Sequence, residues 1–367
     1  MASTDRMEVF NISSIPPRKL TISAIIPVYN GGENFRRSLL SLAETAPHPN
    51  EIIVVADGDT DGSWHMAEEF GAKILRLPAR GGPAHARNLG AHEAQGDILF
   101  FMDADVAVPP NTIEQITSTF NRNPGLAALF GSYDNEPEAK NFLSQYKNLF
   151  HHYIHQRACN EASTFWGACG AIRHDVFMSI GGFDEHYRQP SIEDIELGYR
   201  LKQAGHKIWL YKDLQVKHLK CWRVFSLIKS DFFHRALPWT DLILRDRRFI
   251  NDLNLRFSSR MSVILTYALI GALIGARWWY GAIAVASVSA LLLLIINQPV
   301  YQFFLQKRGF WFMMRTIPWH WFYFFYSGLG FIVGVSRFLF FSRKSQKLSL
   351  PGITRRRSDT IPYPEGH

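Results

Sequence analysis

Three long uncharged stretches near the C-terminus limit what this chain can fold into more than any other feature. Met261–Ala276, Trp278–Gln306 and Thr316–Ser336 contain 16, 29 and 21 consecutive residues without Asp, Glu, Lys or Arg. Such runs are typical of membrane-spanning helices, because a backbone in lipid must satisfy its own hydrogen bonds. A buried helical core is the alternative, but a soluble domain seldom needs three runs of this length. We therefore expect a membrane domain of two to three hydrophobic segments over residues 260–341.

Basic residues predict how these segments are oriented. The formal net charge of +8 lies entirely in residues 306–367, where ten Lys and Arg face two acids. Lys-rich and Arg-rich loops stay in the cytosol, and the loop Lys307–Arg315 and the tail 342–367 are both basic. The first two runs should therefore form a hairpin that turns at Arg277–Gly281. A simple third span would place the tail outside, against this rule, unless Ser327–Gly330 breaks it into a re-entrant hairpin.

The part of the chain before these runs is expected in the cytosol, which makes the whole a multi-pass protein of the cell (inner) membrane. Residues 1–20, an N-terminal extension, have charged residues and two adjacent prolines but no apolar run, so no signal peptide is predicted. Residues 1–305 sum to zero charge, which argues against a nucleic-acid partner. Residues 221–259 mix aromatic and basic side chains, which is typical of interfacial amphipathic helices in contact with membrane lipids; an ordinary packing helix is the alternative.

Residues 21–220 predict an α/β domain with a doubly wound, mainly parallel sheet. Four short apolar runs are predicted strands: Thr21–Val28, Glu51–Ala56, Lys73–Leu77 and Asp97–Met102. Helical patterns lie between them, at Glu33–Thr45, Ser63–Gly71 and Gly82–Gln95. Near-continuous apolar runs suit strands that are buried on both faces of a parallel sheet. Ligands of such folds bind at the carboxyl ends of the strands.

Acidic residues follow the predicted strands at these ends. Asp57 follows the second strand, and Asp103 and Asp105 follow the fourth. Two carboxylates one residue apart repel each other unless a cation lies between them, and hard oxygen ligands suit Mg²⁺ or Mn²⁺ that also contacts phosphate oxygens. An isolated Asp-x-Asp is more often a solvated turn. Here, however, a predicted buried strand precedes Asp103 and Asp105, and Asp57 follows another strand at the corresponding position. These two features favour a metal–diphosphate site.

Six motifs, in their order and spacing, resemble those of the family 2 glycosyltransferases. They are Ser23–Asn30, Val54–Gly62, Pro83–Gly90, Asp103–Asp105, Gly181–Glu185 and Glu193–Leu197, and the resemblance covers roughly residues 20–220. It implies a GT-A nucleotide-sugar-binding fold, a nucleotide-sugar donor, a divalent metal and inversion at the anomeric carbon. The Gln-x-x-Arg-Trp signature of processive polysaccharide synthases is missing, and His234–Trp239 is the nearest segment, so repeated chain extension is not expected.

The resemblance implies a donor site residue by residue. The residues implied to bind the nucleotide sugar are Pro27, Tyr29, Glu33, Asp57, Asp103 and Asp105. Asp57 would accept a hydrogen bond from the base, and Asp105 would bind the metal that bridges the diphosphate. His218 occupies the place where some relatives supply a third metal ligand; a plain surface histidine is the alternative. Ala56 departs from the family pattern, because relatives often have a second Asp there.

On the acceptor side, the resemblance implies Asp194 as the general base that takes the proton from the acceptor hydroxyl. The alternative is an acid favoured by the dipole at a helix N-terminus. Glu193 would bind the acceptor or cap the helix. Gly182 would serve turn geometry beneath the acceptor. Arg87 is expected to be a structural ion-pair partner rather than a phosphate clamp.

Together these features predict a membrane-anchored, inverting, metal-dependent glycosyltransferase of the hexosyltransferase type. It would move a sugar from a nucleotide-diphosphate sugar, with a UDP-sugar favoured, to a lipid-linked or membrane-proximal saccharide. The acceptor is predicted from the membrane anchor, because an enzyme with a soluble acceptor has no evident need for an anchor. The alternative is a polyprenyl-phosphate sugar synthase, whose lipid phosphate acceptor needs no base. A third interpretation is that the chain is not an enzyme but a protein that binds a nucleotide sugar without catalysing its transfer.

Overall fold

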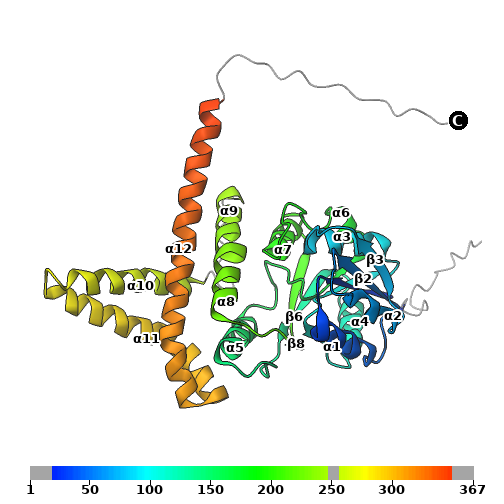
Figure 1. The fold of residues 1–367 in the computed structure, drawn as a ribbon, viewed down its shortest axis with the longest axis horizontal. Coiled ribbons are helices and arrows are strands. Elements are labelled where there is room, and N and C mark those ends of the chain that lie inside the picture. The colour runs from blue at the N-terminus through cyan, green and yellow to red at the C-terminus, as the bar shows by residue number, and fades with distance from the viewer. Residues whose placement is uncertain (1–18, 247–255, 349–367) are drawn as a thin grey trace, which may run out of the picture.

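The computed structural model describes residues 19–246 and 256–348 (Figure 1). Its first part is an eight-stranded sheet in the order β3-β2-β1-β4-β7-β6-β8-β5. The strands are β1 Ile22–Val28, β2 Glu51–Asp57, β3 Lys73–Leu77, β4 Ile98–Met102, β5 Val106–Ala107, β6 Leu126–Tyr133, β7 Cys169–Arg173 and β8 Lys207–His218. β1 pairs in parallel with β2 and β4, and β2 with β3. β7 runs antiparallel to both β4 and β6, so the mixed sheet changes direction there.

The four predicted strands are β1 to β4, and each predicted end lies within one residue of the observed one. The apolar runs of β1, β2 and β4 are largely buried because helices cover the sheet, and every residue of β4 is buried. β3, at the edge of the sheet, is only partly buried. The helices of this part are α1 Gly32–Ala43, α2 Ser63–Glu68, α3 Pro83–Glu93, α4 Thr112–Arg122, α5 Phe142–Arg157, α6 His174–Ser179 and α7 Glu193–Gln203. The α/β class with a mainly parallel sheet is confirmed.

Two short helices and a π-helical turn lie between this domain and the apolar helices. They are α8 Val224–Asp231, η2 Phe232–Ala236 and α9 Leu237–Asp246. Trp239 donates from Nε1 to the hydroxyl of Tyr199 on α7 (3.1 Å), and the Ser191 hydroxyl donates to the carbonyl of His234 (2.9 Å). The segment predicted to be interfacial is therefore fastened to the α/β domain. Its end, residues 247–255, lies outside the described residues.

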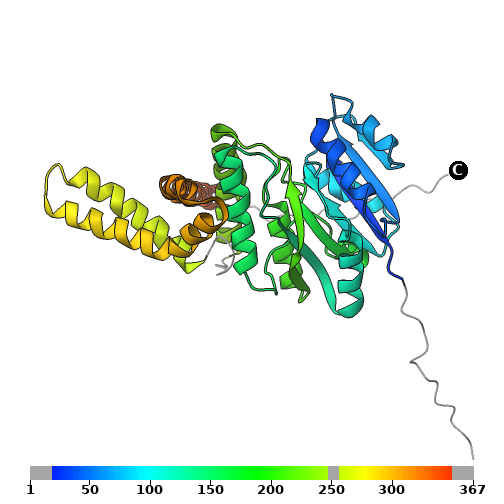
Figure 2. The ribbon, with the colours of Figure 1, turned by 90° about the horizontal axis from the view of Figure 1, so that it is seen from below.

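Three C-terminal helices are long and apolar enough to cross a membrane. α10 Phe257–Gly275 and α11 Gly281–Arg308 form the predicted hairpin, in which Asn297 donates to the Ser262 hydroxyl (2.9 Å). The turn between them exposes Trp278–Tyr280. Figure 2 shows this hairpin pointing away from the sheet, with the next helix between the two.

That next helix, α12, is continuous from Phe310 to Leu348. Of the two alternatives for the third run, the structure therefore excludes the re-entrant break at Ser327–Gly330. The glycines allow close packing instead of a break: a Cβ added to Gly328 would lie 2.5 Å from the Tyr267 ring on α10. Residues 1–18 of the predicted N-terminal extension and the tail beyond Leu348 lie outside the described residues.

Candidate active site

Asp57 ends β2, and its carboxylate organises the loop before α3. The side chain is buried, and its two oxygens accept hydrogen bonds from the backbone N–H groups of Gly81 (2.6 Å) and Gly82 (2.9 Å). Gly82 has φ +97°, and a Cβ there would lie 2.5 Å from the Arg188 carbonyl oxygen, so only glycine fits. β1 separates β2 from β4, which places Asp57 about 10 Å along the sheet from Asp103.

The loop after β1 contributes an exposed aromatic side chain near Asp57. Tyr29 is 44% exposed, and the guanidinium carbon of Arg80 lies 4.2 Å from its ring centroid. Arg80 precedes the Gly81 N–H that Asp57 accepts. Pro27 is half-buried in β1, and Glu33 is exposed in the first turn of α1. The four residues predicted to hold the nucleoside thus lie on β1, β2 and the loop and helix after β1.

Arg87 of α3 is the buried centre of the site. Its Nη2 lies 2.6 Å from Asp103 Oδ1, and its Nη1 lies 2.9 Å from Glu193 Oε1. Burial alone would lower the pKa of Arg87, but the two carboxylates raise it overall. The other oxygen of Glu193 accepts from the backbone N–H of Ser191 (2.9 Å). Both oxygens of Glu193 are thus engaged, which favours a capping and positioning role over acceptor binding.

Asp105 and His218 face each other across the pairing of β5 with β8. His218 Nε2 lies 3.6 Å from Asp105 Oδ2, and its Nδ1 lies 2.8 Å from the amide oxygen of Asn148. The Asn148 contact orients the imidazole, as a second contact does for metal-ligating histidines. Burial would raise the pKa of Asp105, but His218 lowers it to about 2.

These two residues fit a divalent cation that takes its other ligands from a diphosphate and water. Among the described residues, no group of three His, Cys, Asp or Glu side chains could hold a metal alone. A half-buried carboxylate and a buried imidazole, aimed at each other, are suitable ligands for Mn²⁺. The chain therefore offers part of a coordination sphere, which a bound diphosphate would complete.

Asp194 stands in the first turn of α7 on the other side of Arg87. Its Oδ2 accepts from the backbone N–H of Gly167 (3.1 Å). Burial raises the pKa of Asp194 to about 6, and the Glu193 carboxylate acts in the same direction. A carboxylate with a raised pKa at the edge of a cavity is a candidate general base. Asp194, Asp103 and Asp105 all contribute to the raised pKa of half-buried Tyr133, so these three acids share one region.

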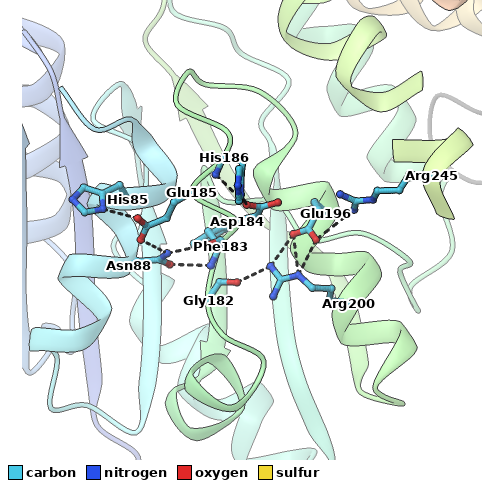
Figure 3. A network of polar contacts seen from close by, with 10 residues as sticks. All are labelled: His85, Asn88, Gly182, Phe183, Asp184, Glu185, His186, Glu196, Arg200 and Arg245. Atoms are coloured by element: carbon cyan, nitrogen blue, oxygen red, sulfur yellow. Dashed lines mark hydrogen bonds and ion pairs between the residues drawn. The ribbon is translucent and has the colours of Figure 1, made fainter. Parts of the chain in front are cut away.

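A network of polar contacts fixes the segment Gly182–His186 between α3 and α7 (Figure 3). Asn88 donates to the Phe183 carbonyl (2.9 Å) and accepts from its N–H (2.8 Å). Arg200 of α7 donates to the Gly182 carbonyl (2.6 Å) and pairs with Glu196. Gly182 has φ +66°, and a Cβ there would meet Asn88 at 2.6 Å, which accounts for glycine by turn geometry. The network holds α7, and hence Asp194, at a fixed place relative to Arg87.

Asp194 opens onto a cavity that we call the acceptor-side cavity. Its wall is made by α5, α7, η2, α9 and α12, and its polar residues are Lys147, His151, His155, Thr164, Ser191, Asp194, Asp231 and Arg235. Its aromatic residues include Phe150, Trp166, Trp239 and Tyr323. Burial lowers the pKa of His155 to about 3, so this histidine is neutral at physiological pH. The cavity therefore extends from Asp194, the expected base, to residues of α9 and of the apolar helix α12.

Several residues of this cavity were not predicted as site residues. Lys147 of α5 pairs with Asp231 of α8 (2.5 Å), and Asp231 accepts from the Tyr326 hydroxyl of α12 (2.9 Å). Arg235 also lines the cavity. Arg235 lies in the His234–Trp239 segment. This segment is the nearest match to the Gln-x-x-Arg-Trp signature of processive synthases but does not contain it. The sequence held no signal for Arg235, because the π-helical turn that carries it is visible only in the structure; such turns gather at functional sites.

The sequence matches a known family profile and several known proteins. The sequence profile of the family described as "Glycosyl transferase family 2" matches residues 23–181. The glycosyltransferase AglE of Haloferax volcanii is 27% identical over 205 residues, which are 53% of this chain and 65% of AglE, just under two thirds of its length. The O-antigen chain rhamnosyltransferase WbaN of Salmonella anatum is 25% identical over 235 residues, 60% of this chain and 74% of WbaN.

A solved structure extends the similarity to the fold. The mannosyltransferase PcManGT of Pyrobaculum calidifontis, in complex with GDP-Man and Mn²⁺, aligns with a TM-score of 0.60 and 17% identity. The alignment covers 87% of this chain and 90% of that one. At this identity the similarity shows the fold. Residues 23–181 thus match the family 2 glycosyltransferase profile, the chain has a GT-A-like fold, and three C-terminal helices are apolar enough to cross a membrane.

Proposed function

We propose that this protein is a glycosyltransferase that moves a sugar, with inversion, from a nucleotide-diphosphate sugar to a saccharide acceptor that is lipid-linked or lies at the membrane. The single observation that carries this proposal is the position of Asp194. It lies between the Arg87–Asp103 cluster and a cavity walled by α9 and α12. An acceptor in that cavity would approach from the side of the apolar helices. The cell (inner) membrane, with the GT-A domain on the cytosolic side, is the location that fits.

In this proposal, the donor's nucleoside lies near Asp57 and Tyr29, and its diphosphate lies near Asp103 and Asp105. A divalent cation held by Asp105 and His218 would stabilise the charge on the departing nucleoside diphosphate. The complex of PcManGT with GDP-Man and Mn²⁺ supports a donor and metal of this kind. Arg87 keeps Asp103 in place through their 2.6 Å ion pair.

On the acceptor side, Asp194 takes the proton from the attacking hydroxyl as its oxygen bonds to the anomeric carbon. The bond from that carbon to the diphosphate oxygen breaks, and the diphosphate leaves with the electron pair. A positioned carboxylate contributes roughly 10²–10⁴-fold to such a step. The raised pKa of Asp194 suits this role, because a base near the working pH can both accept and release a proton.

Transfer to a polyprenyl phosphate is the second candidate, and Arg235 is the observation that favours it. Its guanidinium lines the acceptor-side cavity and makes no hydrogen bond or ion pair with another described residue. A free guanidinium suits a phosphate. An ionised phosphate needs no general base, however, so this candidate gives Asp194 no chemical role.

The test is a panel of labelled UDP-, GDP- and dTDP-sugars incubated with the full chain, Mn²⁺ and a total lipid extract, followed by mass analysis. We expect label in a lipid-linked saccharide, and label only in water-soluble product would reject the proposal. Asp194→Asn separates the two candidates. Near-normal turnover of this variant would favour the polyprenyl-phosphate reaction, whereas a loss of about 10²-fold or more supports the saccharide acceptor.

A further inference from the structure

The helix α12 lies along the catalytic part of the protein over most of its length. Near its start, the ring centroid of Phe312 is 5.0 Å from that of Phe142 on α5. Further along, the Tyr326 hydroxyl donates to Asp231 on α8 (2.9 Å). Further still, a Cβ on Gly334 would lie 2.8 Å from the side chain of Thr240 on α9. At 1.5 Å per residue, these contacts extend over about 33 Å of the helix.

α12 also runs across the α10–α11 hairpin instead of beside it. In Figure 1 the hairpin extends away from the sheet while α12 runs crosswise to it, next to α8 and α9. In Figure 2, turned by 90°, the hairpin still points away and α12 is seen nearly end-on. The two views agree that the hairpin and α12 have very different directions. Membrane-spanning helices tilt on average about 20° from the bilayer normal, so a bilayer that the hairpin crosses with such a tilt would have α12 lying crosswise to its normal.

The hairpin is the element that suits the bilayer core. Its runs Met261–Ala276 and Trp278–Gln306 carry no charge, and α10 with 19 residues is about 28 Å long, close to the roughly 30 Å of hydrocarbon. α12 has 39 residues and would be about 58 Å long, nearly twice that thickness. If α12 crossed, the Lys147–Asp231 ion pair next to Tyr326 would also lie at the depth of the lipid tails, where charges are costly.

The side of α12 away from the protein carries a row of exposed apolar side chains. Trp311, Met314, Phe322, Leu329 and Ile332 are each at least 38% exposed and follow one another at helical spacing. We call these five residues the α12 stripe. Such a stripe suits the boundary between headgroups and acyl chains, where an amphipathic helix buries one face.

We propose that α12 is an interfacial helix that lies in the plane of the membrane surface, so that only the α10–α11 hairpin crosses the bilayer. The α12 stripe then contacts the lipid surface on the side of the catalytic domain. The C-terminal end of α12 is then on that side, which removes the conflict between a third span and the basic residues of 342–367. The proposal rests on the membrane association proposed above, and it adds which elements cross.

The test measures the depth of single labels in vesicles that contain the full chain. Cys159 and Cys221 are exposed and are first changed to Ser, while Cys169 is buried. One cysteine at a time is then placed at Met314, Phe322, Leu329 or Leu339, given a nitroxide, and read by oxygen and nickel accessibility. Matched labels at exposed positions of the hairpin, Ile264, Ile283, Leu291 and Ile295, serve as the comparison set.

We expect the α12 labels to share one shallow depth and the hairpin labels to pass through the bilayer centre. α12 labels that run from shallow to deep and back to shallow would overturn the proposal. A tag after His367 reports independently: reaction with an impermeant reagent on the catalytic side supports the proposal, and reaction on the opposite side overturns it. If the hairpin labels also show no lipid contact, the membrane association of the proposed function fails instead.

Discussion

The donor half of the catalytic domain, β1 to β4 with their loops, is built differently from the acceptor half, which surrounds the acceptor-side cavity. In the donor half, short local segments place each side chain; Asp57, for example, is fixed by Gly81 and Gly82, 24 and 25 residues away. In the acceptor half, the contacts span much longer separations: Lys147 meets Asp231 84 residues later, and Asp231 meets Tyr326 95 residues later. Arg87 joins the halves through Asp103 and Glu193. The comparison suggests that donor binding and acceptor binding are separable.

The largest effect that tests this separation is expected from Asp194→Asn. We expect kcat to fall about 10²–10⁴-fold, because the variant removes the base but keeps the shape of the side chain. Binding of the nucleoside diphosphate, measured by calorimetry, should not change, since Asp194 belongs to the acceptor half. Asp175→Asn, also in the first turn of a helix but exposed and remote, is the matched control and should retain full activity. Loss of nucleotide binding in Asp194→Asn would contradict the separation.

Arg87→Met should affect both halves together. The variant leaves Asp103 and Glu193 without their buried partner, and breaking such a pair costs about 3–5 kcal/mol of unfolding free energy. We expect a lower thermal midpoint of the solubilised chain and a loss of both nucleotide binding and transfer. Arg36→Met replaces an exposed arginine of α1 and should change the unfolding free energy by about 0.5 kcal/mol or less. Normal nucleotide binding in Arg87→Met would show that the donor half does not depend on this link.

The same difference explains how much the sequence could predict. The strands β1 to β4, and the acids at the ends of β2 and β4, follow from apolar runs and motif spacing, because each is specified within a few residues. The pairing of Asp105 with His218 was suggested by the family resemblance, and the structure brings the two within 3.6 Å. The antiparallel β7 and the continuous α12 were not predicted, because both depend on packing against distant segments.

The roles of Glu193 and Arg235 were also beyond the reach of the sequence. Glu193 could bind the acceptor or cap a helix, and only the positions of Arg87 and Ser191 favour capping. Arg235 belongs to a segment that resembles no complete signature, and only tertiary structure brings it into a cavity with Asp194. Tertiary contacts of this kind produce no periodic pattern in the sequence from which they could be predicted.

A smaller effect is expected from Arg235→Gln. The guanidinium would contribute a charge-assisted hydrogen bond to the acceptor of about 1.5–3 kcal/mol, so the KM for the acceptor should rise about 10-fold or more. The dissociation constant for the nucleoside diphosphate should not change if Arg235 belongs to the acceptor half. Lys229→Gln, an exposed cation on neighbouring α8, is the matched control. Weaker nucleotide binding in Arg235→Gln would assign this residue to the donor half.

The smallest effect is the pH dependence of single-turnover transfer. Burial and the Glu193 carboxylate raise the pKa of Asp194 to about 6, and the base works only in its ionised form. The rate should therefore be level above about pH 7 and fall as the pH drops through 6, to roughly a tenth of the plateau at pH 5. Nucleotide binding over the same range should fall less, because Asp194 does not contact the donor half. A rate that stays level down to pH 5 would mean that Asp194 titrates as an ordinary exposed carboxylate, and a parallel fall of binding and rate would place the titrating group in the donor half.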